Sequence, residues 1–179
     1  MLFNICIGLI VLLAIFLIFV ATRPSIFTVT RSAVIPAAPQ TVFALVNSFH
    51  EWDRWSPWAK LDPNCKNSFD GAKSGVGAKF AWDGNREVGA GRMEITDSRP
   101  DAVIMLDLVF IRPMEGTNLT VFDFEPDGNG TRVTWTMSGP VGFMGKLFGV
   151  LMNCEKMVGC QFEKGLNNIR QIVSGNSAP

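Results

Sequence analysis

Hydrophobic and polar positions divide this chain into an apolar N-terminal segment and a longer part in which the two kinds alternate. In residues 2–21, only Asn4, Cys6 and Gly8 interrupt a run of Leu, Ile, Val, Phe and Ala, and the first charged side chain is Arg23. A helix of about 20 apolar residues rises about 30 Å, which matches the hydrocarbon core of a bilayer. The pattern therefore predicts a transmembrane helix at the N-terminus.

A cleaved signal peptide is the competing interpretation of this segment. Signal peptides have a basic start, an apolar stretch of about 7–15 residues and a cleavage site with small residues. Here no Lys or Arg precedes Arg23, the apolar stretch is longer, and the best cleavage candidate, Phe-Val-Ala at residues 19–21, begins with a bulky residue. The pattern favours an uncleaved anchor over residues 1–22, followed by one domain over 23–174 and a flexible tail over 175–179.

The charges beside the apolar segment bear on which side of the membrane the domain faces. Arg23 and Arg31 follow the segment, and only the terminal amine precedes it. The positive-inside rule then favours a cytoplasmic domain of a single-pass membrane protein, but two charges leave the side open. The cysteines agree with a cytoplasmic domain, because Cys65, Cys154 and Cys160 match neither a disulfide framework nor a zinc-binding spacing.

Beyond the apolar segment, the pattern predicts a strand, two short helices and then a series of strands. Residues 26–35 are rich in Val, Thr and Ile, which is typical of a strand. Pro39 suits the first position of a short helix, and residues 47–58 predict a second short helix and a loop. From residue 78 onward, apolar and polar positions alternate with a period of two. Successive strands with short turns between them predict an antiparallel meander with one face toward solvent.

Apolar residues recur at spacings of three and four from Gly145 to Val173, which predicts one long C-terminal helix. Such a helix spans about 43 Å and has a single apolar stripe. Only the inward face of the sheet offers an apolar surface of that length. The order of elements therefore predicts an α+β fold, in which a curved antiparallel sheet is wrapped around a long C-terminal helix and one transmembrane helix precedes it.

Composition narrows the possible functions. Sixteen basic and sixteen acidic residues cancel, and no basic stripe is present, so nucleic-acid binding has no electrostatic basis. Fourteen Phe, five Trp and eight Met accompany a single His and no Tyr, which leaves few groups for acid–base chemistry. This composition favours apolar surfaces and pockets over catalysis.

Several motifs carry a resemblance to a known family. Residues 52–58 read Trp-Asp-Arg-Trp-Ser-Pro-Trp and residues 88–93 read Val-Gly-Ala-Gly-Arg-Met. With further matches at 75–77, 82–85, 131–139 and 159–166, the chain resembles the SRPBCC superfamily, the START and polyketide-cyclase-like group. The resemblance covers residues 26–173 and implies the helix-grip fold, with a gap between sheet and helix that commonly holds a ligand. These motifs specify the fold and not the function.

Apolar residues predicted to face this gap are the best candidates for a ligand site. Alternation predicts that Trp82, Phe122 and Trp135 point toward the C-terminal helix. Large side chains that fill the gap, and leave only a small pocket, are the alternative interpretation. The full set of predicted lining residues is Phe80, Trp82, Met93, Leu108, Phe110, Phe122, Trp135, Met137, Phe148 and Met152.

Other motifs favour structural roles. Trp52, Trp55 and Trp58 could cover a cavity mouth or anchor the domain at a membrane, but packing of the short helices onto the sheet is favoured. The glycines near residues 75–77 and 89–91 lack the context of a phosphate-binding loop and are more typical of bends in a sheet. His50 is expected on a surface loop. The sequence therefore predicts no catalytic residue, no metal site and no cofactor.

Three functions follow from this sequence. The first is a membrane-anchored domain that binds an apolar small molecule, such as a lipid, quinone or isoprenoid. The alternative is an accessory subunit or co-chaperone-like interaction module of a membrane protein complex, which the resemblance permits. A cyclase or dehydratase comes third, because the resemblance allows that chemistry but the sequence offers no convincing acid–base pair.

Overall fold

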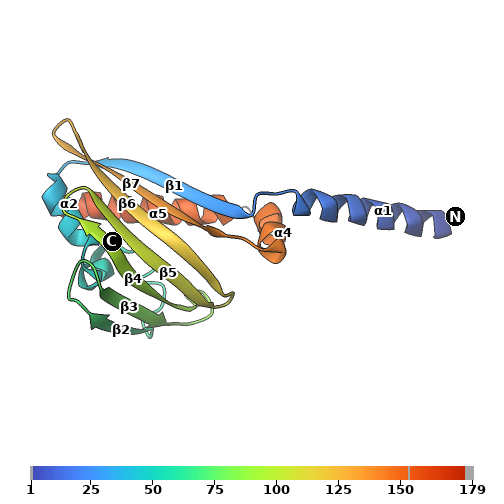
Figure 1. Ribbon diagram of the computed structural model, residues 1–179, viewed down its shortest axis with the longest axis horizontal. Helices are drawn as coiled ribbons and strands as arrows, with labels where there is room; N and C mark the ends of the chain where they lie inside the picture. The colour runs from blue at the N-terminus through green and yellow to red at the C-terminus, as the bar shows by residue number, and fades with distance from the viewer. Residues whose placement is uncertain (1, 153, 176–179) are drawn as a thin grey trace.

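The computed structural model describes residues 2–152 and 154–175. Its first element, α1 (Leu2–Ala21), is a helix that extends away from the rest of the chain (Figure 1). Residues 3–21 of α1 are long and apolar enough to cross a membrane, and nearly all their side chains are exposed. The predicted N-terminal apolar helix is confirmed, and by length and composition it fits either a membrane span or a signal sequence.

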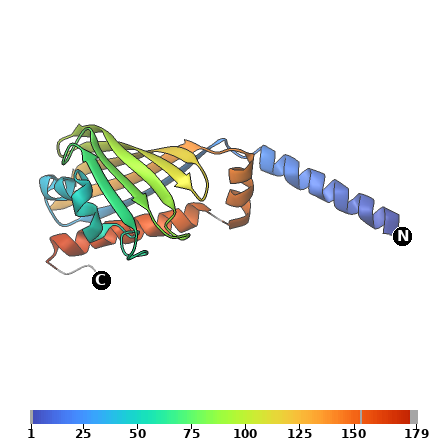
Figure 2. The same ribbon diagram turned by 90° about the horizontal axis from the view of Figure 1, so that it is seen from below.

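Seven strands form one antiparallel sheet in the order β1-β7-β6-β5-β4-β3-β2. Each strand from β2 to β6 pairs with the next strand along the chain, which is a meander, and β1 pairs with β7. The sheet curves around the C-terminal helix (Figure 2), so the predicted helix-grip fold is confirmed. The strands are β1 (Ile26–Ile35), β2 (Lys66–Gly71), β3 (Ala78–Asp83), β4 (Ala90–Arg99), β5 (Val103–Arg112), β6 (Gly116–Asp127) and β7 (Gly130–Pro140).

The C-terminal region forms two helices, α4 (Phe143–Met152) and α5 (Cys154–Val173), and the prediction of one helix over residues 145–173 is wrong in this respect. Only α5 lies along the concave face of the sheet, whereas α4 is turned across the end of the sheet beside α1 (Figure 2). The reason is the distribution of charge. Helix α4 contacts α1, and Lys146 is its only charged residue. Helix α5 has one apolar stripe and a charged opposite side.

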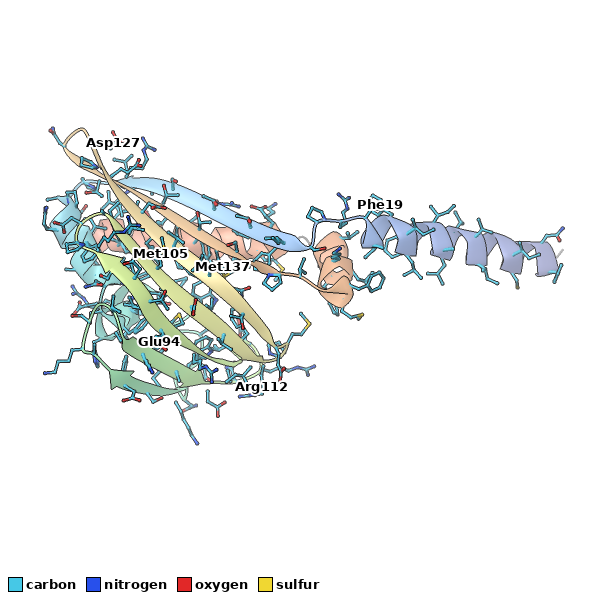
Figure 3. All side chains as sticks on the ribbon, viewed as in Figure 1. Phe19, Glu94, Met105, Arg112, Asp127 and Met137 are labelled. Carbon is cyan, nitrogen blue, oxygen red and sulfur yellow. The ribbon has the colours of Figure 1, made fainter. Side chains whose placement is uncertain are left out.

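The strand register defines two ends of the sheet. The start of β1, the end of β7, the β3–β4 turn and the β5–β6 turn meet at the end from which α1 leaves, and we call this the α1 end. The opposite edge, with the β6–β7 turn, is the far end. Figure 3 shows Arg112 at the α1 end and Asp127 at the far end.

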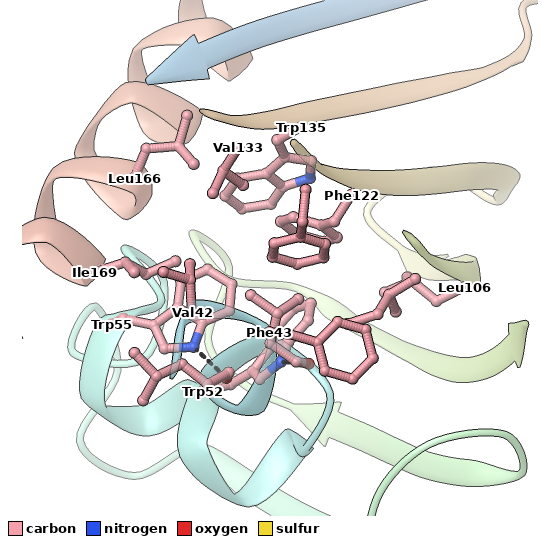
Figure 4. Packing of buried hydrophobic residues seen from close by; sticks show 14 of the residues in the cluster. Val42, Phe43, Trp52, Trp55, Leu106, Phe122, Val133, Trp135, Leu166 and Ile169 are labelled. Carbon is pink, nitrogen blue, oxygen red and sulfur yellow. Dashed lines mark hydrogen bonds between the residues drawn. The ribbon is translucent and has the colours of Figure 1, made fainter. Parts of the chain in front are cut away.

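The core lies between the concave face and the helices α2 (Pro39–Val46), α3 (Trp52–Trp55) and α5, with a 3-10 turn, η1 (Phe49–Glu51), beside them (Figure 4). Trp52 and Trp55 are buried, and their Nε1 atoms donate to backbone carbonyl oxygens of α2 at 2.8 and 2.9 Å. Trp58 is half-buried and packs against the same core. These tryptophans therefore hold the short helices on the sheet.

Candidate ligand site

The sheet places eight of the predicted lining residues on its concave face. Met93, Leu108, Phe122, Trp135 and Met137 belong to the buried core, whereas Phe80, Trp82 and Phe110 are partly buried and pack against it. The remaining two predicted residues lie in α4. Phe148 is 38% exposed and is not brought to the concave face, and the side chain of Met152 lies outside the described residues.

Trp135 is the centre of an aromatic cluster that fills the space under α5. Its ring stacks on Phe162 of α5 at 4.0 Å between centroids, with 6° between the planes. It also lies 4.7 Å from the ring of Phe122 and 5.7 Å from that of Trp55 (Figure 4). In this part of the concave face, large side chains occupy the gap, as the alternative interpretation of the sequence expected.

Toward the α1 end, the concave face is less completely covered. Phe80, Trp82 and Phe110, which we call the aromatic row, are all partly exposed, and neighbouring rings in the row are 6.0 and 6.1 Å apart. Gly91 provides the space for the middle ring, because a Cβ atom there would lie 2.5 Å from the ring of Trp82. The strand pairing also shifts register between Ala90 and Gly91, so this glycine marks a bulge in the curved sheet.

Two buried polar atoms of the concave face have no hydrogen-bond partner among the described residues. They are Oγ1 of Thr120 in β6 and Nε1 of Trp135 in β7, and both residues are 3% exposed. Thr120 pairs with Met137, one position along the face from the pair of Phe122 and Trp135. Buried polar groups are nearly always hydrogen-bonded in folded proteins, so these two atoms mark a place suited to a polar atom of a ligand or to water.

Two of the hollows on the surface of the domain lie outside the space under α5, and Phe80 and Met93 contribute to the lining of the larger one. The smaller, about 110 Å³, lies where β1 meets α5 and is lined by Ser32, Glu163 and Arg170, among others. The larger, about 490 Å³, lies over strands β2 to β5, and charged residues such as Lys79 and Arg92 on the convex side line it. An apolar ligand under α5 would therefore have to displace side chains that now fill that space.

Arg31 has a structural role that the sequence pattern did not show, since it counts there only as a flanking charge. It lies on β1 under α5, where Nη1 contacts Glu155 at 2.8 Å and Nε contacts Glu163 at 2.7 Å. Both carboxylates raise the pKa of the guanidinium group through these hydrogen bonds. Gly159 lies between the two acids, and a side chain there would collide with Arg31. The spacing of four residues from Glu155 to Gly159 and from Gly159 to Glu163 was the sequence feature that could have indicated this contact with Arg31.

Two acid–base groups lie near the aromatic row. His50 is exposed, and its ring stacks at 4.2 Å on Phe69, whose ring lies 5.2 Å from that of Phe80. Asp62 is buried, but its carboxylate accepts backbone N–H groups of Asn64 and Asn85 and so holds two turns together. Among the described residues, no group of three or more His, Cys, Asp or Glu side chains could hold a metal ion.

The cysteines should differ in reactivity. Burial raises the pKa of the Cys65 thiol, and the negative charge of Asp62 adds to this effect, whereas Cys160 is exposed. Because the thiolate is the nucleophile, iodoacetamide should alkylate Cys160 faster than Cys65 near neutral pH. The rate at Cys65 should then rise steeply as the pH is increased toward its raised pKa. Mass spectrometry of peptides measures both rates, and equal rates at neutral pH would contradict the burial of Cys65.

Comparison with known proteins gives a family match over most of the chain. The family described as polyketide cyclase / dehydrase and lipid transport matches residues 27–173. No curated protein sequence matches the chain.

Three solved structures illustrate the similarity of fold. A protein from Mesorhizobium loti is 15% identical with a TM-score of 0.61, over 83% of this chain and 97% of that chain. The Aha1 dimer from Colwellia psychrerythraea is 14% identical with a TM-score of 0.58, over 81% of this chain and 94% of that chain. CalU16 from Micromonospora echinospora is 16% identical with a TM-score of 0.56, over 85% of this chain and 77% of that chain. At these identities the likeness concerns the fold alone.

Proposed function

This chain belongs to the polyketide cyclase / dehydrase and lipid transport family, and on that premise we propose that it binds an apolar small molecule on its concave face at the α1 end. The observation that carries the proposal is the aromatic row of Phe80, Trp82 and Phe110. Large aromatic side chains that stay partly exposed on an otherwise buried concave face are typical of a binding site. A lipid, quinone or isoprenoid has the chemistry that this surface would accept.

The proposed ligand carries one polar atom in addition to its apolar part. The indole Nε1–H of Trp135 can only donate a hydrogen bond, whereas the hydroxyl group of Thr120 can donate or accept. A carbonyl or hydroxyl oxygen of the ligand has the chemistry to pair with either buried group. Entry requires side chains to move apart, and Met93 and Met137 on the same face are flexible enough to adapt.

We further propose that α1 remains attached as a single-pass membrane anchor. The end of α1 packs on the domain, because Val20 is fully buried and α1 contacts α4. Nζ of Lys146 in α4 also donates to the carbonyl oxygen of Ala21 at 3.2 Å. Such contacts favour a helix that stays part of the folded protein, as an uncleaved anchor would.

Native mass spectrometry of the full chain, released gently from its membrane, tests the binding proposal. The wild-type protein should carry a non-covalent apolar adduct, and Thr120→Val should carry less of it. The same substitution should raise the free energy of unfolding by about 1 kcal/mol, because it removes an unpaired buried hydroxyl group and keeps the shape of the side chain. Chemical denaturation in mild detergent measures this second effect.

Leu119→Thr provides the matched control for Thr120→Val. Leu119 is the neighbouring residue of β6 on the opposite face and is 42% exposed. This change should leave both the adduct and the stability unchanged. A wild-type protein without adduct, or full adduct retention in Thr120→Val, would count against the proposed site.

A further inference from the structure

Helix α4 exposes large apolar side chains at the α1 end. Phe143, Met144, Phe148 and Val150 are between 36 and 56% exposed. Lys146 is the only charged residue in this helix of 10 residues. Large apolar side chains that are exposed together on one helix indicate contact with an apolar neighbour.

Two further segments expose apolar residues at the same end. In and beside the β5–β6 turn, Ile111 is 48% and Met114 is 53% exposed, and Ile26 at the start of β1 is 66% exposed. The strand register brings these segments to the α1 end, since Ile26 pairs with the last residue of β7 and Phe110 pairs with Gly116. Figure 1 shows α4 and the right-hand ends of the strands on the side from which α1 leaves.

We name these exposed apolar residues of the α1 end the apolar end surface, and it consists of Ile26, Ile111, Met114, Phe143, Met144, Phe148 and Val150.

We propose that the apolar end surface rests on the same bilayer that α1 spans, a proposal that depends on the membrane anchor of the proposed function. Two observations favour lipid as the occupant. First, α4 is continuous with α1 through their mutual contact and through the bond from Lys146 to Ala21. Second, Arg23 and Lys146 lie where this surface meets α1, and basic side chains at such a boundary suit anionic headgroups.

The length of α4 fits an interfacial position. A helix of 10 residues is about 15 Å long, which is about half of the hydrocarbon thickness, so it cannot span the bilayer. Large apolar side chains cover most of α4, and Gly145, Lys146 and Gly149 form a narrow remaining side, so the helix is suited to lie flat at the boundary between headgroups and acyl chains.

Such docking would bring the aromatic row to the membrane surface. Trp82 pairs with Gly91 and Phe110 pairs with Gly116, and both pairs lie at the α1 end of their strands. An apolar molecule could then pass between the bilayer and the concave face without crossing bulk water. The apolar end surface would thus set the orientation in which the domain meets its ligand.

Photolabelling by lipid tests this orientation on the full chain. The protein is reconstituted into phosphatidylcholine vesicles in which some lipids carry a diazirine in the acyl chain, and labelled peptides are identified by mass spectrometry. We expect label on α1, on α4 and on residues 111–114. Val34 and Val76 are matched controls at the far end, because they are 39 and 58% exposed and should remain unlabelled.

The outcomes separate the two proposals. Absence of label on α1 would overturn the membrane anchor and this inference together. Label on α1 without label on α4 or residues 111–114 would overturn only the docked orientation.

Substitutions in the surface provide a second test. Phe148→Asp and, independently, Met114→Asp should reduce lipid label on α4 and the β5–β6 turn to the level of the far end, while label on α1 is unchanged. Val34→Asp should have no effect on any of these peptides. Full label on α4 in both Asp variants would contradict the proposal.

Discussion

Replacing Trp135 with alanine should lower the free energy of unfolding by about 3–5 kcal/mol, the range for removal of a fully buried large aromatic side chain. Trp135 is 3% exposed and lies at the point where β7, α3 and α5 meet. The substitution removes the stacked contact with Phe162 and leaves a cavity lined by rigid rings, which cannot collapse easily. Chemical denaturation of the full chain in mild detergent measures the effect.

Trp135→Phe is the control that separates packing from hydrogen bonding. It keeps an aromatic ring against Phe162 and removes the Nε1–H group, which has no partner in the part of the chain that the structure describes. Its cost in stability should therefore be clearly smaller than that of the alanine variant. A loss below about 1 kcal/mol for Trp135→Ala would show that the cluster is not packed as the structure has it.

The same pair of variants distinguishes a ligand site from a plain core. If the Nε1–H group contacts a polar atom of the ligand, Trp135→Phe should reduce the adduct seen by native mass spectrometry although the domain stays folded. If the part of the concave face around Trp135 serves only as a core, Trp135→Phe should leave the adduct unchanged. The second result would restrict the proposed site to the aromatic row nearer the α1 end.

The face of the sheet on which each strand residue lies could be predicted from the sequence, because each central strand has one buried face. In β6, for example, Thr120 and Phe122 lie on the buried face, whereas Asp123 lies on the other. Apolar and polar residues that alternate along a strand indicate directly which face is buried, since a slip of one residue would move every side chain to the opposite face.

The division of the C-terminal region could not be predicted in the same way. Apolar residues at spacings of three and four continue from α4 into α5, and this pattern does not tell which surface each part will contact. Leu166 and Ile169 of α5 are buried on the core, whereas Phe143 and Phe148 of α4 are exposed beside α1. The sequence feature that distinguishes the two helices is a nearly uncharged stretch before an amphipathic helix, which indicates that they contact different surfaces.

The candidate site was predictable in its location and not in its detail. The alternation of apolar and polar residues identifies which apolar residues face the helix. Only the three-dimensional packing shows that Trp135 and Phe162 fill the space while Trp82 remains partly exposed. Likewise, the sequence places Thr120 beside Phe122 without showing whether its hydroxyl group finds a partner. Both properties depend on contacts between residues that are distant in the chain.

Two arginines in the middle of α1 should release the protein from the membrane. Each arginine near the centre of a spanning helix costs about 2.5–3.5 kcal/mol of insertion free energy, so Leu12→Arg with Leu13→Arg should cost about 5–7 kcal/mol in total. Both leucines are exposed in the structure and contribute to the apolar surface that lipid would cover. The measurement is the fraction of protein that stays in the membrane pellet after an alkaline carbonate wash.

The location of the new charges, rather than their number, should decide this result. Thr22→Arg with Ser25→Arg adds the same two charges just beyond α1, where basic side chains are tolerated at the membrane boundary, and it should leave the protein in the pellet. The mass of the wild-type chain gives the independent check on the anchor. A mature protein that begins near Thr22 would identify α1 as a signal peptide, and retention of the double Leu variant in the pellet would show that another part of the protein holds it there.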